Sequence, residues 1–110
     1  MIRIVTDEDL QKALDWLRDN AAPIGDAKAR LVKAGHMIKH IEALQFMKSD
    51  QKSAEARKAE ARMSQTYLDA INEEASACGE YEKMKALREA AALKIESWRS
   101  EQANYRAMKV

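Results

Sequence analysis

The chain has 110 residues, and its 19 Lys and Arg against 18 Asp and Glu leave a formal net charge of +1. This length is ordinary for one domain, and the total charge indicates no particular partner. The single cysteine excludes an intramolecular disulfide, and no apolar run is long enough to predict a membrane span.

Helix-forming residues dominate the chain, which contains only three Gly and one Pro. Ala, Glu, Lys, Arg, Leu and Met are abundant, and these residues lose little rotamer freedom in a helix. We therefore expect one all-α domain over residues 1–110. Its expected architecture is an elongated helical hairpin or bundle with a long C-terminal helix, assembled as a coiled-coil-like oligomer.

The first predicted helix covers residues 6–20. The β-branched residues before it make 1–5 a candidate extended arm, which is either flexible or adds to another chain. Thr6 to Asp9 has the spacing of a capping box, with three carboxylates where the helix dipole favours them. We expect this helix to stop at Ala22-Pro23, because the residue before a proline avoids the helical region.

The second predicted helix covers residues 24–48. Its apolar residues recur at spacings of three and four, which is typical of the seam of a coiled coil. We therefore expect a homo-oligomer. The predicted interface residues are Ile24, Leu31, Ile38 and Ile41, joined by Leu87 and Ile95 from the C-terminal helix.

Two further helices are predicted at 53–63 and 66–107. A polar break around 49–53 separates the first of them from the preceding helix, and 64–66 either interrupt or bend the chain between the two. Gly79 is the expected kink in the last helix, since glycine costs about 1 kcal/mol relative to alanine inside a helix.

The near-neutral total hides an uneven distribution of charge. Residues 26–62 and 83–110 each carry a net charge of +4, whereas 63–82 carry five acidic groups and no basic one. The basic segments could bind a polyanion, or they could match the acidic segment inside a helical assembly. The candidate residues for binding single-stranded nucleic acid are Lys28, Arg30, Lys33, Lys39, Arg57, Lys58, Arg62, Arg88, Trp98, Arg99, Tyr105 and Arg106.

The last five of these residues share one region of the C-terminal helix. In this region the arginine side chains could neutralise the phosphates of a bound strand, and the faces of Trp98 and Tyr105 could stack on its bases. The alternative is that both aromatic rings are core and that the arginines pair with acidic neighbours. For the basic segment 26–62, the alternative is an ordinary solvated surface.

Few residues indicate catalysis or metal binding. His36 and His40 stand four apart on one helix face and could begin a zinc site, but no further ligand follows at the required spacing. Cys78 is expected to be a buried small residue. We therefore expect neither enzymatic activity nor a metal or cofactor.

Four short motifs toward the two ends of the chain are distinctive enough to compare with known proteins. They are Ile95–Ser100 (IESWRS), Gln102–Ala107 (QANYRA), Ala13–Ala21 (ALDWLRDNA) and Ala27–Arg30 (AKAR). In these motifs the chain resembles a group of small helical proteins of temperate phages and prophages, and the resemblance implies a place among recombination and replication functions. The overall plan is also similar to that of UvsY-type recombination mediators.

Two functional hypotheses follow. The first is a phage DNA recombination or replication accessory protein that binds single-stranded DNA without sequence preference, as a homo-oligomer, and assists a recombinase or annealing protein. The alternative is a phage helical interaction module that inhibits a host enzyme, for example an anti-CRISPR, with the acidic segment as its active surface. Either protein is expected to be soluble and cytoplasmic, with no membrane partner.

Overall fold

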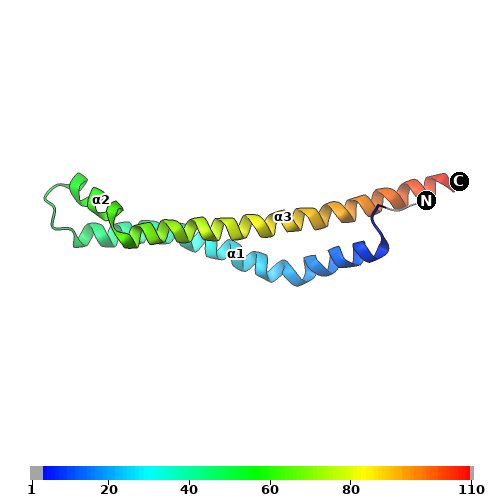
Figure 1. The fold of residues 1–110 in the computed structure, drawn as a ribbon, viewed down its shortest axis with the longest axis horizontal. Coiled ribbons are helices and arrows are strands. Elements are labelled where there is room, and N and C mark those ends of the chain that lie inside the picture. Colours follow the sequence, from blue (N-terminus) through cyan, green and yellow to red (C-terminus); the bar gives the residue numbers. More distant parts are fainter. Residues whose placement is uncertain (1–3, 110) are drawn as a thin grey trace. The chain divides into compact units, whose positions relative to one another are not determined.

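Three α-helices account for most of residues 4–109, which are the residues that the computed structural model describes. They are α1 (Asp7–Lys48), α2 (Ala54–Met63) and α3 (Gln65–Met108), and no strand occurs among the described residues (Figure 1). The predicted all-α fold with a long C-terminal helix is therefore confirmed. Both α2 and α3 begin and end within one residue of the predicted 53–63 and 66–107.

The predicted capping box begins α1. Thr6 Oγ1 accepts a hydrogen bond from the backbone N–H of Asp9 at 3.0 Å, and Asp9 Oδ2 accepts one from the backbone N–H of Thr6 at 3.1 Å. The bond from the Thr6 backbone lowers the pKa of Asp9, and the bond with the Thr6 side chain adds to this effect. Two N–H groups that a helix start leaves without partners are thereby satisfied.

The backbone of Ile4 and Val5 is hydrogen-bonded to α3, although the Ile4 side chain remains exposed. Glu101 Oε1 accepts hydrogen bonds from the backbone N–H groups of Ile4 at 3.0 Å and of Val5 at 3.2 Å, and the Val5 side chain is buried. The expectation of a flexible or strand-adding arm is wrong for these two residues, because their donors and one side chain are engaged within the chain. Residues 1–3 of that arm lie outside the described residues.

The predicted stop at Ala22-Pro23 is wrong, because α1 continues through Pro23 and joins the expected helices 6–20 and 24–48 into one. A proline inside a helix removes one hydrogen bond and costs about 3 kcal/mol. Burial of Ile24, the next residue, and of Ala27, one turn further on, offsets this cost. Asn20 also donates from Nδ2 to the Trp16 carbonyl oxygen at 2.9 Å, which adds a side-chain bond to the turn before the proline.

Serine side chains define the connections on both sides of α2. Ser53 caps the helix by accepting from the backbone N–H of Ala56 at 3.0 Å. In the loop before it, the buried Ser49 donates to Glu60 Oε2 at 2.9 Å. Ser64 has an extended backbone and accepts from the N–H of Tyr67 at 3.2 Å, so α2 and α3 are separate helices and not one bent helix.

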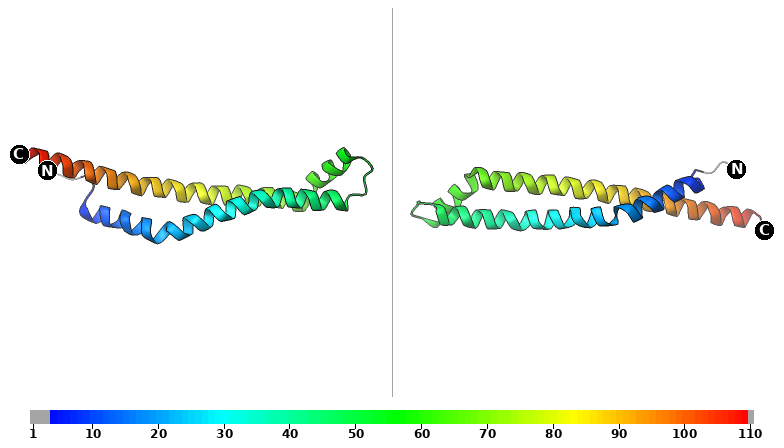
Figure 2. Two further views of the ribbon diagram at one scale, coloured as in Figure 1. Left: turned by 180° about the vertical axis from the view of Figure 1, so that it is seen from behind. Right: turned by 90° about the horizontal axis from the view of Figure 1, so that it is seen from below.

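The chain divides into two compact units, where the sequence predicted one domain. Unit 1 combines the chain up to Gly25 with the chain from Lys83 onward, and unit 2 is Asp26–Glu82. Both long helices therefore contribute to both units. Within unit 2, the end of α1 runs beside the beginning of α3 in the opposite direction (Figure 2).

Alanine accounts for six of the eight buried apolar positions among residues 4–109, the other two being Val5 and Ile24. Ala13 and Ala91 are buried in unit 1, and Ala61 and Ala77 in unit 2 are completely covered, each at 0% exposure. Alanine permits close approach of helix backbones but buries little apolar area. Not one large side chain among residues 4–109 is fully buried, so the interior of each unit is thin.

Candidate functional site

Acidic side chains of unit 2 engage two of the predicted DNA-binding arginines. Arg30 Nε donates to Glu73 Oε1 at 2.8 Å, and its Nη2 lies 3.3 Å from Ser76 Oγ. This hydrogen bond raises the pKa of Arg30 and lowers that of Glu73. Arg62 pairs with Glu42 at 3.5 Å. The basic segment 26–62 is thus matched in part by acidic groups of the same unit.

An open groove on unit 2 brings together two of the predicted lysines. Its volume is about 560 Å³, and its lining residues are Lys39, Glu42, Ala43, Phe46, Met47 and Lys58. Met47 is 76% exposed and Phe46 is half-buried. The groove therefore presents an apolar surface from α1 with ammonium groups from both α1 and α2.

Arg57 lies over Phe46 at this end of unit 2. Its guanidinium carbon is 5.8 Å from the ring centroid, and its Nε donates to the carbonyl oxygen of Gln51 at 2.7 Å. The cation–π contact and the backbone bond fix the guanidinium over one ring face. A second contact of this kind places Lys28 Nζ 4.9 Å from the Tyr81 ring centroid.

The arginine and aromatic residues predicted on the C-terminal helix all belong to unit 1. Trp98 is half-buried, and its Nε1 donates to Asp7 Oδ1 at 2.9 Å, so the indole is tied to the first turn of α1. Arg99 donates to Glu96 at 3.0 Å, and Lys109 lies over the Tyr105 ring at 4.5 Å. These residues are therefore engaged within the chain as well as being near solvent.

Arg88, Arg99 and Arg106 are all exposed on α3. Because α3 is unbroken, spacings of 11 and 7 residues keep the three guanidinium groups on one side of the helix. Helix rise places the outer two about 27 Å apart along the axis. The remaining predicted basic residue, Lys33, is exposed on α1 and lines a separate groove with Arg30.

The predicted oligomer seam faces mainly inward. Ile24 is buried within the chain and is unavailable to a second chain. Of the other five residues, only Leu87 is exposed, at 43%, while the remainder are half-buried: Leu31, Ile38, Ile41 and Ile95. Much of the apolar face given by the spacing of three and four therefore packs inside the chain, and its role as an oligomer interface stays a prediction.

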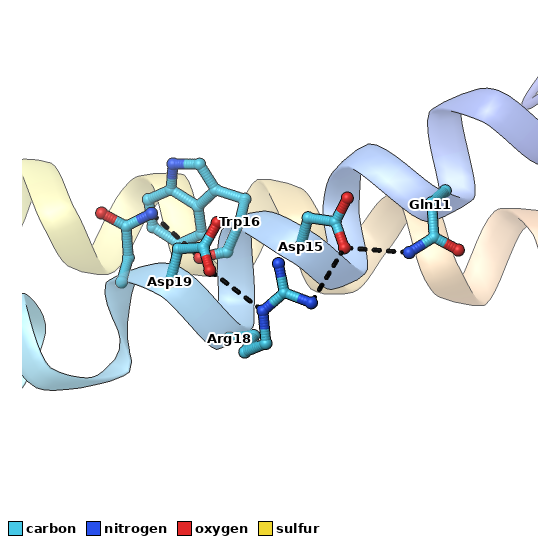
Figure 3. Close-up of polar contacts among 6 residues, drawn as sticks. Gln11, Asp15, Trp16, Arg18 and Asp19 are labelled. Atoms are coloured by element: carbon cyan, nitrogen blue, oxygen red, sulfur yellow. Dashed lines mark hydrogen bonds and ion pairs between the residues drawn. The ribbon is translucent and has the colours of Figure 1, made fainter.

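The sequence did not predict a network of polar side chains on α1 in unit 1, in which two aspartates surround Arg18. Arg18 donates from Nε to Asp19 at 3.0 Å and pairs with Asp15 at 3.5 Å, and Gln11 donates to the same Asp15 oxygen at 2.9 Å (Figure 3). The bond to Asp19 raises the pKa of Arg18 most, followed by the charges of both aspartates. This guanidinium is balanced by two carboxylates, so the segment offers little to a polyanion.

Other chemistry-bearing residues lie apart. His36 and His40 are exposed, and no group of three or more His, Cys, Asp or Glu suited to a metal ion occurs within residues 4–109. The expectation of a buried Cys78 is wrong: its side chain is exposed, because one helical step separates it from the buried Ala77.

No protein family model, curated protein or solved structure matches this chain. Within the described part of the chain, no helix combines the length and apolar character needed to cross a bilayer.

Proposed function

We propose that this protein acts by helical assembly, packing its exposed apolar side chains against a second copy of itself. The observation that carries this proposal is the thin interior: no large side chain of residues 4–109 is fully buried. Large apolar side chains are instead exposed on each helix, including Met47, Met63 and Leu93 at 76%, 86% and 67%.

Sedimentation velocity and size-exclusion chromatography with light scattering test this proposal directly. A particle of twice 12.5 kDa or more at micromolar protein concentration is the expected result. Dilution should then give a concentration-dependent return to the monomer. A single species of monomer mass at tens of micromolar protein would refute self-association.

A second candidate function is non-specific binding of single-stranded DNA, as expected for a phage recombination or replication accessory protein. The row of Arg88, Arg99 and Arg106 on one exposed side of α3 favours it, because guanidinium groups at such spacing can follow a phosphate backbone. The contact between Arg99 and Glu96 is exposed and therefore weak enough for phosphate to replace it.

Fluorescence anisotropy with a labelled oligonucleotide tests the second candidate. Affinity should fall as salt rises, and the double change Arg88→Ala and Arg106→Ala should flatten the plot of log K against log salt. The matched control is Lys12→Ala with Arg18→Ala, which removes equal charge from the same unit. Equal slopes for both double variants would refute a role for the α3 row.

A further inference from the structure

Unit 1 contains a small pocket between the first part of α1 and the second half of α3. Its volume is about 210 Å³. Lys12 and Trp16 line it from α1 and Lys94 lines it from α3, while every other lining side chain is alanine or Leu87. The polar side chains of this lining are therefore all hydrogen-bond donors, two ammonium groups and one indole N–H. A ligand that fits the pocket has to supply the acceptors.

Trp16 brings an unused polar group to this pocket. Its indole is half-buried, and Nε1 makes no hydrogen bond to any of residues 4–109. The other tryptophan, Trp98, donates from Nε1 to Asp7 at 2.9 Å and so serves the fold. An indole with a free N–H, beside an apolar surface of alanine and Leu87, is suited to stacking against a flat ring that carries acceptors.

The two lysines supply positive charge from both helices. Lys94 forms no ion pair within the described residues, and Lys12 pairs with Glu8 at 3.3 Å, with side chains 73% and 78% exposed. So exposed a pair contributes little, and an anionic ligand can replace Glu8. The nearby Asp9 carboxylate accepts from the backbone N–H of Thr6 at 3.1 Å and caps α1. After its hydrogen bonds with Thr6, the charges of Lys94 and Lys12 also lower the pKa of Asp9, so both ammonium groups lie near this carboxylate.

We propose that this pocket binds one nucleotide, with the base stacked on Trp16 and the phosphate held between Lys12 and Lys94. A base supplies a flat ring with acceptor atoms, and a phosphate supplies the negative charge that the two ammonium groups favour. Pockets for drug-sized ligands measure about 300–1,000 Å³, so this smaller one fits a single ring system with one anionic group. A free nucleotide and one nucleotide of a strand offer the same chemistry, and the experiment below separates them.

The site goes beyond both functions proposed above. It needs no second copy of the chain, because all of its lining residues belong to unit 1. It is also separate from the row of Arg88, Arg99 and Arg106, since Lys94 lies about 120–140° around α3 from these three residues.

Nitrogen–proton correlation spectra of the whole protein test the proposal. The two tryptophans give two indole N–H signals, and Trp16→Phe identifies the Trp16 signal by its loss. Added deoxyadenosine monophosphate should shift the Trp16 signal and leave the Trp98 signal in place, because Trp98 already donates to Asp7. The shift should saturate with a dissociation constant of about 1 mM, since one stacked base and two exposed charge contacts give weak binding.

Two variants separate the base from the phosphate, with backbone N–H signals as the measure of binding. Trp16→Leu keeps an apolar side chain but removes the stacking surface, and should weaken binding by about fivefold to a hundredfold. Lys94→Glu should weaken binding of the nucleotide by about tenfold and leave binding of deoxyadenosine, which has no phosphate, unchanged. The matched control is Lys83→Glu, at an exposed position of α3 in the same unit but about 16 Å from Lys94 along the axis. It should change binding by less than about threefold. Far-ultraviolet circular dichroism confirms that each variant is helical.

The ligands decide between the outcomes. If the nucleotide leaves the Trp16 signal unmoved, or if inorganic phosphate alone produces the whole shift, no base stacks in the pocket and the inference is overturned. Binding of deoxyadenosine as tight as that of its monophosphate would overturn the role of the lysines. Equal losses from Lys94→Glu and Lys83→Glu would do the same.

A short deoxyadenosine oligonucleotide distinguishes the two sources of the ligand. If it shifts the Trp16 signal at lower concentration than the mononucleotide does, the site holds one nucleotide of a strand. If only the mononucleotide shifts the signal, the site is one for a free nucleotide, and either result supports the pocket. Arg88→Ala with Arg106→Ala should leave mononucleotide binding within about twofold, so failure of the α3 row or of self-association leaves this inference standing.

Discussion

Gly79→Ala tests the unbroken helix α3 at the position where the sequence predicts a kink. Gly79 lies inside α3, and no described glycine has a positive φ. A Cβ at this position would have no neighbour within 4 Å. The methyl group therefore causes no clash, while the unfolded chain loses conformational freedom. We expect the free energy of unfolding to rise by about 0.5–1 kcal/mol.

The other two glycines calibrate this expectation. Gly25 also has open space around its Cβ position, so Gly25→Ala should give a similar gain. A Cβ at Gly35 would lie 3.0 Å from Glu74 Oε2. That oxygen ends a flexible side chain, which can shift at a small cost, so Gly35→Ala should stabilise by less than the other two changes.

Thermal and urea unfolding, followed by far-ultraviolet circular dichroism at one protein concentration, measure the three variants. A gain of this size corresponds to a rise in Tm of about 2–6 °C. Repeating the measurement at several protein concentrations separates helix stability from any effect on association. Destabilisation by Gly79→Ala at every concentration would mean that Gly79 is strained or contacts a neighbour, and the reasoning from an open, regular helix would be refuted.

Two exposed polar contacts give the remaining predictions. Asp7→Ala should destabilise the protein by about 0.5–1.5 kcal/mol more than Glu8→Ala in urea unfolding. Both changes remove a carboxylate from the first turn of α1, but only Asp7 accepts a hydrogen bond from Trp98. Equal losses of stability would show that this bond contributes nothing. The pKa of Glu73 is lowered by its bond from Arg30, so its stabilising contribution should be complete above the ordinary glutamate pKa of about 4.3 and should be lost as the pH falls through the lowered pKa. The difference in stability between the unaltered protein and Glu73→Gln should therefore shrink from pH 7 to pH 3, and a constant difference would contradict this assignment.

The helix boundaries could be predicted wherever a local polar side chain sets them. Thr6 and Ser53 each accept from the backbone N–H three residues later, and these bonds begin α1 and α2. Ser64 ends α2 and accepts from the beginning of α3. Such caps depend on residues within one turn, so their spacing in the sequence is sufficient.

Pro23 is the position where a local rule fails. The preference of a residue before proline is a short-range steric effect, and it predicts a helix end. The outcome depends also on the burial of Ile24 and Ala27, whose covering residues come from elsewhere in the chain. Sequence spacing gives the apolar face of a helix but not the energy of the contacts that cover it, so the continuous α1 could not be predicted.

The same limit applies to the candidate site. The seam of Leu31, Ile38 and Ile41 could be predicted as apolar, but the spacing does not say whether the covering helix belongs to the same chain or to another. Nor could the bonds from Trp98 to Asp7 or from Ile4 and Val5 to Glu101 be predicted, because they join residues more than 90 positions apart.

The charge distribution is used in part by the fold itself. The bond between Arg30 and Glu73 joins the basic segment to the acidic segment inside unit 2. Arg62 of the basic segment also pairs with Glu42 of α1 in the same unit. The net charge of a segment, counted along the sequence, therefore overstates the charge that its surface offers to a partner, because only the three-dimensional structure shows which groups already face an opposite charge.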